Sequence, residues 1–371
     1  MVRRSVAATE NNPVGGKPPT ILLRRVISVR EWRVFVPLLI MWIFLSLAVP
    51  TFLSSRNITN LLFESAVVGV MALGTTVVLI TGEIDLSLGA VEGLSGILAA
   101  LAMTRGDMGW LVGVVVALAT GAAVGVINGF FTAWLRIPSF IVTLAMLGVA
   151  TGVADVVSGG QTLYDFPHVY QQIGQGAIGR FGYPVFISIG VAILLHLLLR
   201  RTRTGLMFYG VGSNARAADL IGISTRRVKL FAFVISGVCA AIGGIIVSAE
   251  LNAANPELGT ENLLNAIAAV VIGGTALTGG EGSILGTGIG VLVIGTITNG
   301  LDLKNVNPFW QQFVVGLAIL TVGGISVMTG RGAVAENPLR WLRRPPGGQS
   351  TAEAGIARAD ASAVVPDVHP R

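Results

Sequence analysis

The chain has 371 residues, of which 53% are hydrophobic and only 12% are charged, and its mean hydropathy is +0.76. Its 49 glycines are well above the roughly 7% of an average protein. This composition excludes an ordinary soluble domain and indicates a polytopic helical membrane protein. The net charge of +6 would suit a nucleic-acid-binding protein, but the basic residues fall in the two tails and in the loops between apolar runs instead.

Side chains that carry out chemistry are few. The single cysteine, Cys239, lies in an apolar run, cannot form an internal disulfide and is most simply a small packing residue. The three histidines are scattered, so no Cys/His spacing predicts a metal site. We find no nucleophile and base pair either. The sequence therefore predicts no catalytic residue, no metal and no enzymatic activity.

In chain order, residues 1–33 form a basic tail with seven Lys and Arg residues, which we expect to be cytoplasmic. Ten apolar segments follow, each about long enough to cross roughly 30 Å of hydrocarbon as an α-helix. They are residues 34–53, 60–82, 86–104, 109–135, 137–157, 181–199, 230–250, 262–279, 283–301 and 308–329. The sequence thus predicts an all-α transmembrane domain over residues 34–330, followed by a disordered cytoplasmic tail, rich in Pro, Ala and Gly, over residues 331–371.

The basic residues test this topology, because Lys and Arg accumulate in cytoplasmic loops. With the N-terminus inside, ten crossings place 21 of the 25 Lys and Arg residues on the cytoplasmic side. Only Arg56, Arg105, Arg180 and Lys304 fall outside. The pattern favours ten helices with both termini in the cytoplasm, although an extra pair of crossings would leave both ends there too.

The two halves of the chain resemble each other. Residues 127–129 (Ile-Asn-Gly) precede a Pro-Ser-Phe helix start at 138–140, and residues 298–300 (Thr-Asn-Gly) precede a Pro-Phe-Trp start at 308–310. In the topology above, one Asn-Gly pair ends a helix inside and the other ends one outside. This predicts two inverted five-helix halves, an arrangement common in transporters. Chance similarity between glycine-rich helices is the alternative.

The most informative stretch is residues 79–90, where Glu83, Asp85 and Ser87 stand between apolar runs. Acidic side chains are costly in hydrocarbon and normally face a protein interior or a water-filled path. Asp85 and Ser87 are also good N-cap residues and would equally start the following helix. Glu83 would equally sit at the headgroup boundary.

The longest cytoplasmic loop, residues 200–229, contains the pattern of a short helix. Asn214 can cap it, Ala217 and Ala218 favour it, and Gly222 can end it. A short, stiff helix that projects from a membrane protein is a natural docking element for a soluble partner. A surface helix that lies against lipid headgroups is the alternative.

Together, the motifs at residues 83–87, 212–223 and 271–283 resemble the permease subunit of ribose/xylose-type ABC sugar importers. Two further motifs, at residues 52–62 and 138–144, match in the family's order, and the resemblance runs from about residue 50 to 330. Many relatives have Gly where this chain has Glu83. The Glu form resembles the xylose-permease branch and favours a pentose such as xylose or ribose.

This resemblance implies an importer of the bacterial inner membrane. An extracytoplasmic sugar-binding protein would deliver a monosaccharide, two permease copies would form the pathway, and two cytoplasmic ABC ATPase subunits would drive it. A homodimer is expected, since such importers need two permease halves. Asn214, Ala217, Ala218 and Gly222 would then belong to the helix that couples this chain to the ATPase.

The sequence agrees with a separate ATPase. It lacks the Gly-x-x-x-x-Gly-Lys-Ser/Thr loop, since its one Gly-Lys pair, Gly16-Lys17, is followed by Pro18 in a tail. We therefore expect no cofactor in this chain and assign ATP binding to the partner ATPase.

A neutral sugar offers hydroxyl groups that donate and accept hydrogen bonds, so carboxylates, amides and hydroxyls are suitable partners. Five residues with such groups are candidates for the substrate path: Glu83, Asp85, Ser87, Asn128 and Asn299. Glu64 and Glu92 are weaker candidates. A permease that receives its cargo from a binding protein needs only weak contacts, so structural roles for several of these residues stay open.

Two alternatives remain at this stage. An ABC permease for branched-chain amino acids or another small solute would have the same architecture. A proton-coupled secondary transporter would use Glu83 or Asp85 and would need no ATPase.

Overall fold

The structure is a computed structural model that describes residues 29–328. Its helices are α1 (Val29–Ala48), α2 (Ser55–Ile80), α3 (Leu88–Thr104), α4 (Trp110–Ala133), α5 (Ser139–Ser158), α6 (His168–Gln175), α7 (Tyr183–Arg201), α8 (Arg203–Ser213), α9 (Ala215–Leu220), α10 (Thr225–Leu251), α11 (Thr260–Ile272), α12 (Ile284–Leu303) and α13 (Pro308–Met328). Four two-residue strands, β1 (Leu163–Tyr164), β2 (Ala177–Ile178), β3 (Phe181–Gly182) and β4 (Ala253–Ala254), form the pairs β1–β4 and β2–β3. One compact unit ends at Gly324, and a second unit begins at Ile325.

Every predicted apolar segment contains a helix. Among the described residues, six helices are long and apolar enough to cross a membrane: α2, α4, α5, α7, α10 and α12. Four shorter apolar stretches lie in α1, α3, α11 and α13. The fold class, a polytopic helical membrane protein, is confirmed at this level.

Several boundaries differ from the prediction, among them the end of α1 and the start of α2, which each lie five residues before the expected position. Helix α1 begins at Val29, inside the expected tail of residues 1–33, and α10 begins at Thr225, inside the expected loop. Helix α11 ends at Ile272 rather than at 279, because Gly274 and Gly279 in the following loop have left-handed backbone angles that leave the helix. The remainder of the two predicted tails, residues 1–28 and 331–371, lies outside the described residues.

The two longest helices, α2 and α10, lie at the centre of this unit. The apolar spans of α2 and α10 are 83% and 61% buried, against 28%, 22% and 17% for α4, α5 and α7. The two central helices run antiparallel, because Gly74 of α2 packs on Ser236 and Cys239 of α10, whereas Met71 packs on Gly243. The buried Cys239 therefore acts as a small packing residue, as expected.

Glycines allow the closest helix contacts. At the crossing of α4 and α10, a Cβ on Gly237 would overlap the carbonyl oxygen of Gly121, and the reverse also holds. Gly273 and Gly286 meet in the same way at the crossing of α11 and α12. Small residues let membrane helices approach this closely. The glycine-rich stretch of residues 273–290 therefore has a packing role at the crossing of α11 and α12.

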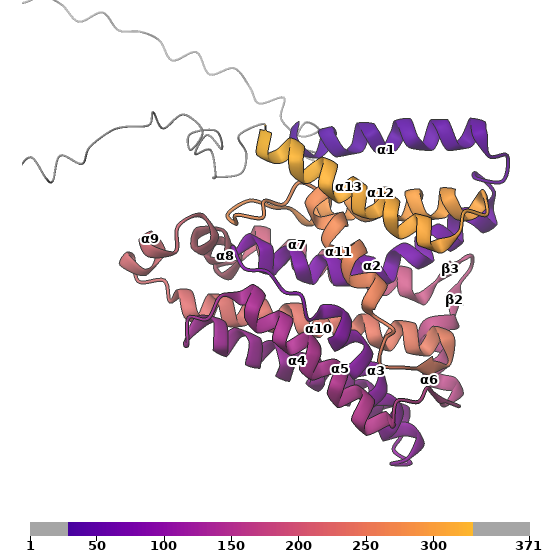
Figure 1. Ribbon diagram of the computed structural model, residues 1–371, viewed down its shortest axis with the longest axis horizontal. Helices are drawn as coiled ribbons and strands as arrows, with labels where there is room; N and C mark the ends of the chain where they lie inside the picture. Colours follow the sequence, from indigo (N-terminus) through magenta and orange to yellow (C-terminus); the bar gives the residue numbers. More distant parts are fainter. Residues whose placement is uncertain (1–28, 329–371) are drawn as a thin grey trace, which may run out of the picture. The chain divides into compact units, whose positions relative to one another are not determined.

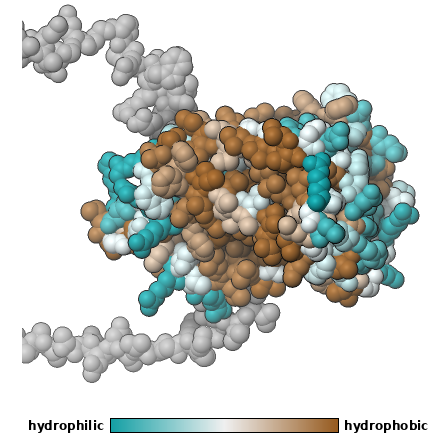
Figure 2. Space-filling view, turned by 90° about the horizontal axis from the view of Figure 1, so that it is seen from below, coloured by the Kyte–Doolittle hydropathy of each residue, from teal (hydrophilic) through white to brown (hydrophobic). Residues whose placement is uncertain are grey.

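The surface fits a membrane environment. Figure 2 shows one face on which hydrophobic side chains gather across the middle and hydrophilic ones towards the two ends. Large apolar side chains on the outer helices are exposed, among them Val156 of α5 (82%) and Leu194 of α7 (67%). In hydrocarbon such side chains contact lipid, so their exposure is no penalty.

The two ends of the bundle carry different elements. Figure 1 shows α8 and α9 at one end, and α6 with the β2–β3 hairpin at the other. At the hairpin end, Arg180 donates to the Ser55 hydroxyl over 3.1 Å, and Lys304 donates to the Ala48 carbonyl over 3.1 Å. The first contact joins the hairpin to the start of α2, and the second joins the end of α12 to the end of α1.

Candidate functional site

The stretch that carries Glu83, Asp85 and Ser87 is a non-helical segment, residues 81–87, between α2 and α3. It begins beside Gly279 and ends at α3, whose Gly89 packs on Leu263 of α11. Helix α11 continues nine residues past Leu263, so α3 starts about 13 Å short of the end of α11. The 81–87 segment therefore carries the chain from one end of the bundle into its interior.

Helix α5 satisfies the backbone of Ile84 in this segment. The Ile84 amide donates to Ser139 Oγ over 3.1 Å, and Thr143 Oγ1 donates to the Ile84 carbonyl over 3.3 Å. Residues four apart lie on the same helix face, so one face of α5 presents both hydroxyls. Non-helical backbone at membrane depth needs such partners, because no water replaces them.

Asp85 is the centre of a buried polar network. Its Oδ1 accepts from the Ser87 amide (3.0 Å) and hydroxyl (2.7 Å), and its Oδ2 accepts from Ser236 Oγ of α10 (2.9 Å). Asn128 of α4 donates to Ser87 Oγ over 2.9 Å. Asp85, Ser87 and Asn128 are each at most 2% exposed. The network thus ties the segment to α4 and α10.

Glu83 forms an ion pair with Lys229 near the start of α10, and both side chains are partly buried. Each charge compensates the other at the point where the chain leaves α2. This contact joins the 81–87 segment to the chain region that follows α9.

Asn299 does not join the other four predicted path residues. It forms a reciprocal amide pair with Asn57, at 2.9 and 3.0 Å, and Asn57 also donates to the Phe52 carbonyl. Asn57 lies in the first turn of α2, whereas the 81–87 segment follows the end of this helix, so about 35 Å of helix separates the two sites. Substrate contact by any of the five residues stays a prediction.

The short helix predicted in the loop of residues 200–229 is α9. As predicted, Asn214 caps it by accepting from the Ala217 amide over 3.0 Å, and Gly222 leaves it with φ +85°. Ala218 is buried, whereas Ala217 and Gly222 are exposed. The tip presents two apolar side chains, Leu220 (88% exposed) and Ile221 (77% exposed).

Helix α9 is attached firmly to the bundle. Asp219 accepts from the amide and hydroxyl of Thr225, both over 3.2 Å, at the first turn of α10. Just before α9, Gly212 packs against both partners of a backbone hydrogen bond, which the Gly280 amide donates to the Ile80 carbonyl over 2.9 Å. A Cβ on Gly212 would overlap that carbonyl oxygen. Three chain segments therefore meet at Gly212: the ends of α2 and α8, and the loop before α12.

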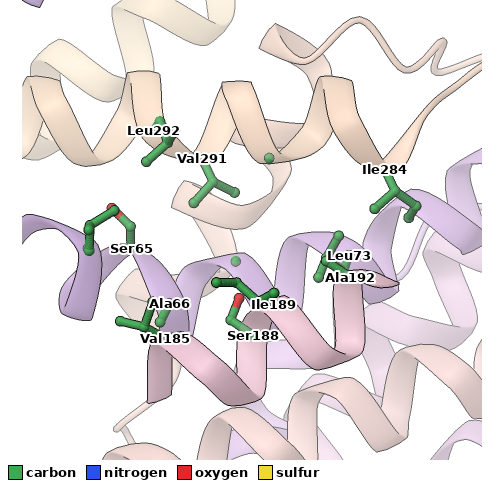
Figure 3. A pocket seen from close by; sticks show the side chains of 13 residues that line it. Ser65, Ala66, Leu73, Val185, Ser188, Ile189, Ala192, Ile284, Val291 and Leu292 are labelled. Carbon is green, nitrogen blue, oxygen red and sulfur yellow. The ribbon is translucent and has the colours of Figure 1, made fainter. Parts of the chain in front are cut away.

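Two cavities lie outside this network. A groove of about 240 Å³ between α2, α7 and α12 is lined by apolar side chains and by Ser65 and Ser188 (Figure 3). A second cavity, of about 410 Å³, lies near the start of α2 and the end of α10. Its polar lining comes from Asn60, Glu64, Gln175 and Glu250.

Several residues that organise this region have no signal in the sequence alone. Ser236 and Lys229 of α10 lie far along the chain from their partners, Asp85 and Glu83. Asn262 of α11 likewise lies far from Glu92, to which its side-chain amide donates. Ser139 and Thr143 are the exception, because their spacing of four within the Pro138–Leu144 motif marks one helix face. Within the described residues, no group of three or more His, Cys, Asp and Glu side chains is placed to hold a metal ion.

Comparison with known proteins adds a family. Residues 57–323 match the family model described as branched-chain amino acid transport system / permease component. The chain is 37% identical to the ribose import permease protein of Escherichia coli (strain K12) over 294 residues, 78% of this chain and 91% of that protein. No solved structure matches.

Two further relatives extend the comparison. The ribose import permease protein of Bacillus subtilis (strain 168) is 38% identical over 288 residues, 77% of this chain and 89% of that protein. The xylose transport system permease protein of Haemophilus influenzae is 32% identical over 356 residues, 79% of this chain and 95% of that protein. Overall identity is thus higher with these ribose permeases than with the xylose permease.

Replacing Ser139 by Ala should destabilise the protein, because it removes the acceptor of the buried Ile84 amide. We expect a loss of roughly 1–3 kcal/mol and a lower midpoint of thermal unfolding in detergent. Ser158→Ala, at the other end of α5, is the matched control, since Ser158 donates only to the Asp155 carbonyl, which Gly160 also contacts. Equal midpoints for the two variants would contradict this role of Ser139.

Proposed function

This chain belongs to the permease-component family of branched-chain amino acid transport systems, and from this premise we propose that it is the membrane-spanning subunit of an ATP-driven monosaccharide importer. The observation that carries the proposal is the identity of 32–38% with permeases named for ribose and xylose. The transport component itself is not an enzyme.

The sugar is proposed to be a pentose. The family description names branched-chain amino acids, which was our alternative, but the relatives that match over most of the chain are named for sugars. Glu83 favours the xylose branch, whereas overall identity favours ribose. Xylose and ribose are therefore the first substrates to compare.

The partners follow from the same premise. Because the sequence has no phosphate-binding loop of its own, ATP is bound by separate cytoplasmic ABC ATPase subunits. An extracytoplasmic binding protein delivers the sugar, and a second copy of this chain completes the pathway. No cofactor is assigned to this chain.

For the transmembrane arrangement, we propose ten crossings, one for each of α1, α2, α3, α4, α5, α7, α10, α11, α12 and α13. Arg180 and Lys304, which the charge pattern places outside, contact the hairpin end of the bundle. Lys229, which it places inside, pairs with Glu83 at the opposite end, near α9. This agreement supports cytoplasmic termini.

Packing also supports two inverted halves. Helix α10 packs against α3 and α4, and the antiparallel α2 packs against α11 and α12. Each central helix thus contacts the corresponding pair from the other half. Helices α3 and α11 each follow a non-helical segment, residues 81–87 and 252–259.

In the transport cycle, ATP-driven closure of the ATPase pair pushes on α9. The exposed Leu220 and Ile221 are suited to an apolar groove of the partner. Because Asp219 holds the start of α10 and Gly212 holds the end of α2, movement of α9 reaches both central helices. Two permease copies then rock between outward-open and inward-open states.

The contacts do not favour the proton-coupled alternative. Glu83 is paired with Lys229, and both carboxylate oxygens of Asp85 accept hydrogen bonds. A proton carrier must bind and release a proton in each transport cycle. The contacts of Glu83 and Asp85 oppose this exchange.

The proposal is tested by ATP hydrolysis in vesicles that contain this chain, a candidate ATPase and a sugar-binding protein. We expect hydrolysis to be stimulated when the binding protein carries its pentose. Gly212→Ala should reduce this stimulation at least tenfold, because the added methyl group separates α8 from Ile80. Gly210→Ala is the matched control, since a Cβ there meets nothing within 4 Å.

Two results would count against these claims. Normal stimulation of the Gly212→Ala variant would show that the Gly212 contact does not couple the subunits. A wild-type chain that no sugar-loaded binding protein stimulates would contradict the importer function itself.

A further inference from the structure

Four carboxylate side chains meet one face of α10: Asp219, Glu83, Asp85 and Glu92. In this order they contact Thr225, Lys229, Ser236 and Gly243. Positions four or seven apart recur on one face of an α-helix, so these four contacts form a single stripe. The stripe extends about 27 Å, from the end that carries α9 into the middle of the bundle.

The first three contacts attach separate chain segments to α10. Asp219 is in α9 and accepts two hydrogen bonds from Thr225. Glu83 and Asp85 are in the 81–87 segment and bind Lys229 and Ser236. A movement of α9 therefore reaches the 81–87 segment through α10 without passing through lipid-facing helices.

Glu92 ends the stripe in a different way. The residue opposite, Gly243, has no side chain to bond, and a Cβ there would lie 3.6 Å from the carboxyl carbon of Glu92. The carboxyl group instead extends to α11, where Oε1 accepts from Asn262 Nδ2 over 2.9 Å. Glu92 is thus the point at which the stripe passes from α10 to α11.

The surroundings of Glu92 indicate a linking role. The residue is fully buried, and its Oε2 lies against Gly259, immediately before α11. A Cβ on Gly89, one turn earlier in α3, would lie within 3.0 Å of the Gly259 carbonyl group, and one on Gly93 would overlap the Pro256 carbonyl oxygen. Helix α3 therefore packs closely against the chain just before α11. Within this contact, Glu92 and Asn262 form a side-chain hydrogen bond.

We propose that this carboxylate stripe transmits movement of α9 to the start of α11, and that Glu92 is the positioning residue at its inner end. The inference rests on the proposed function, since it requires an ATPase that acts on α9. It assigns to Glu92 a role in coupling rather than in sugar contact.

The test compares two substitutions of Glu92 in vesicles that contain the complete importer. Glu92→Gln keeps an oxygen that accepts from Asn262, so pentose uptake should stay within twofold of wild type. Glu92→Leu removes the acceptor and should reduce uptake at least tenfold and abolish the stimulation of ATP hydrolysis by loaded binding protein. Assembly with the ATPase and basal hydrolysis should stay within twofold of wild type, which separates uncoupling from misfolding.

Two further variants complete the design. Asn262→Leu removes the donor and should reproduce the uncoupling seen with Glu92→Leu. Ser95→Ala is the matched control on the same helix, because its buried hydroxyl has no hydrogen-bond partner among the described residues, and it should behave as wild type.

The proposal is overturned if Glu92→Leu and Asn262→Leu both transport normally, or if both fail to assemble with the ATPase. It is also overturned if Glu92→Gln is as defective as Glu92→Leu, since the charge and not the hydrogen bond would then matter. A wild-type complex without stimulation overturns the proposed function, and that result is visible before any variant is made.

Discussion

A backbone that leaves the helical conformation inside a hydrocarbon layer must find hydrogen-bond partners within the protein. The 81–87 segment meets this requirement by lying among α4, α5 and α10. Ser139 and Thr143 of α5 bind the backbone of Ile84, and Ser236 of α10 binds Asp85. Because these partners come from helices far apart in the chain, their hydrogen bonds to the 81–87 segment determine how those helices pack.

The contacts of the 81–87 segment indicate that its buried polar residues are structural, which distinguishes them from residues that line a cavity. In this arrangement Asp85, Ser87 and Asn128 are buried and bonded to protein, so they hold the segment in place. The cavity that contains Glu64 and Glu250 offers carboxylates and amides at the opposite end from α9, the end to which the proposed binding protein would deliver a sugar. In the proposed function, coupling would run through α9, which Asp219 and Gly212 attach to the two central helices. A rigid connection of this kind suits a subunit that must move when its partner closes.

Local signals explain what the sequence predicted. Apolar length predicted a helix in each of ten segments, and Asn214 with Gly222 predicted the ends of α9, because capping depends on residues within one turn. The end of α11 was missed because the apolar run continues past Ile272, where glycine backbone angles end the helix. Partners such as Ser236, 151 residues from Asp85, leave no local signal. The separation of Asn299 from Asp85 likewise depends on the fold, since both are simply polar residues in apolar surroundings.

The most direct measurement is the uptake of labelled pentose into vesicles that contain this chain, with its ATPase and loaded binding protein supplied on the appropriate sides. The account predicts accumulation that requires ATP, the ATPase and the binding protein together, and that a proton gradient does not replace. Accumulation driven by a proton gradient in vesicles that contain this chain alone would contradict it. Glu83 and Asp85 would then be the residues at which to look for the proton.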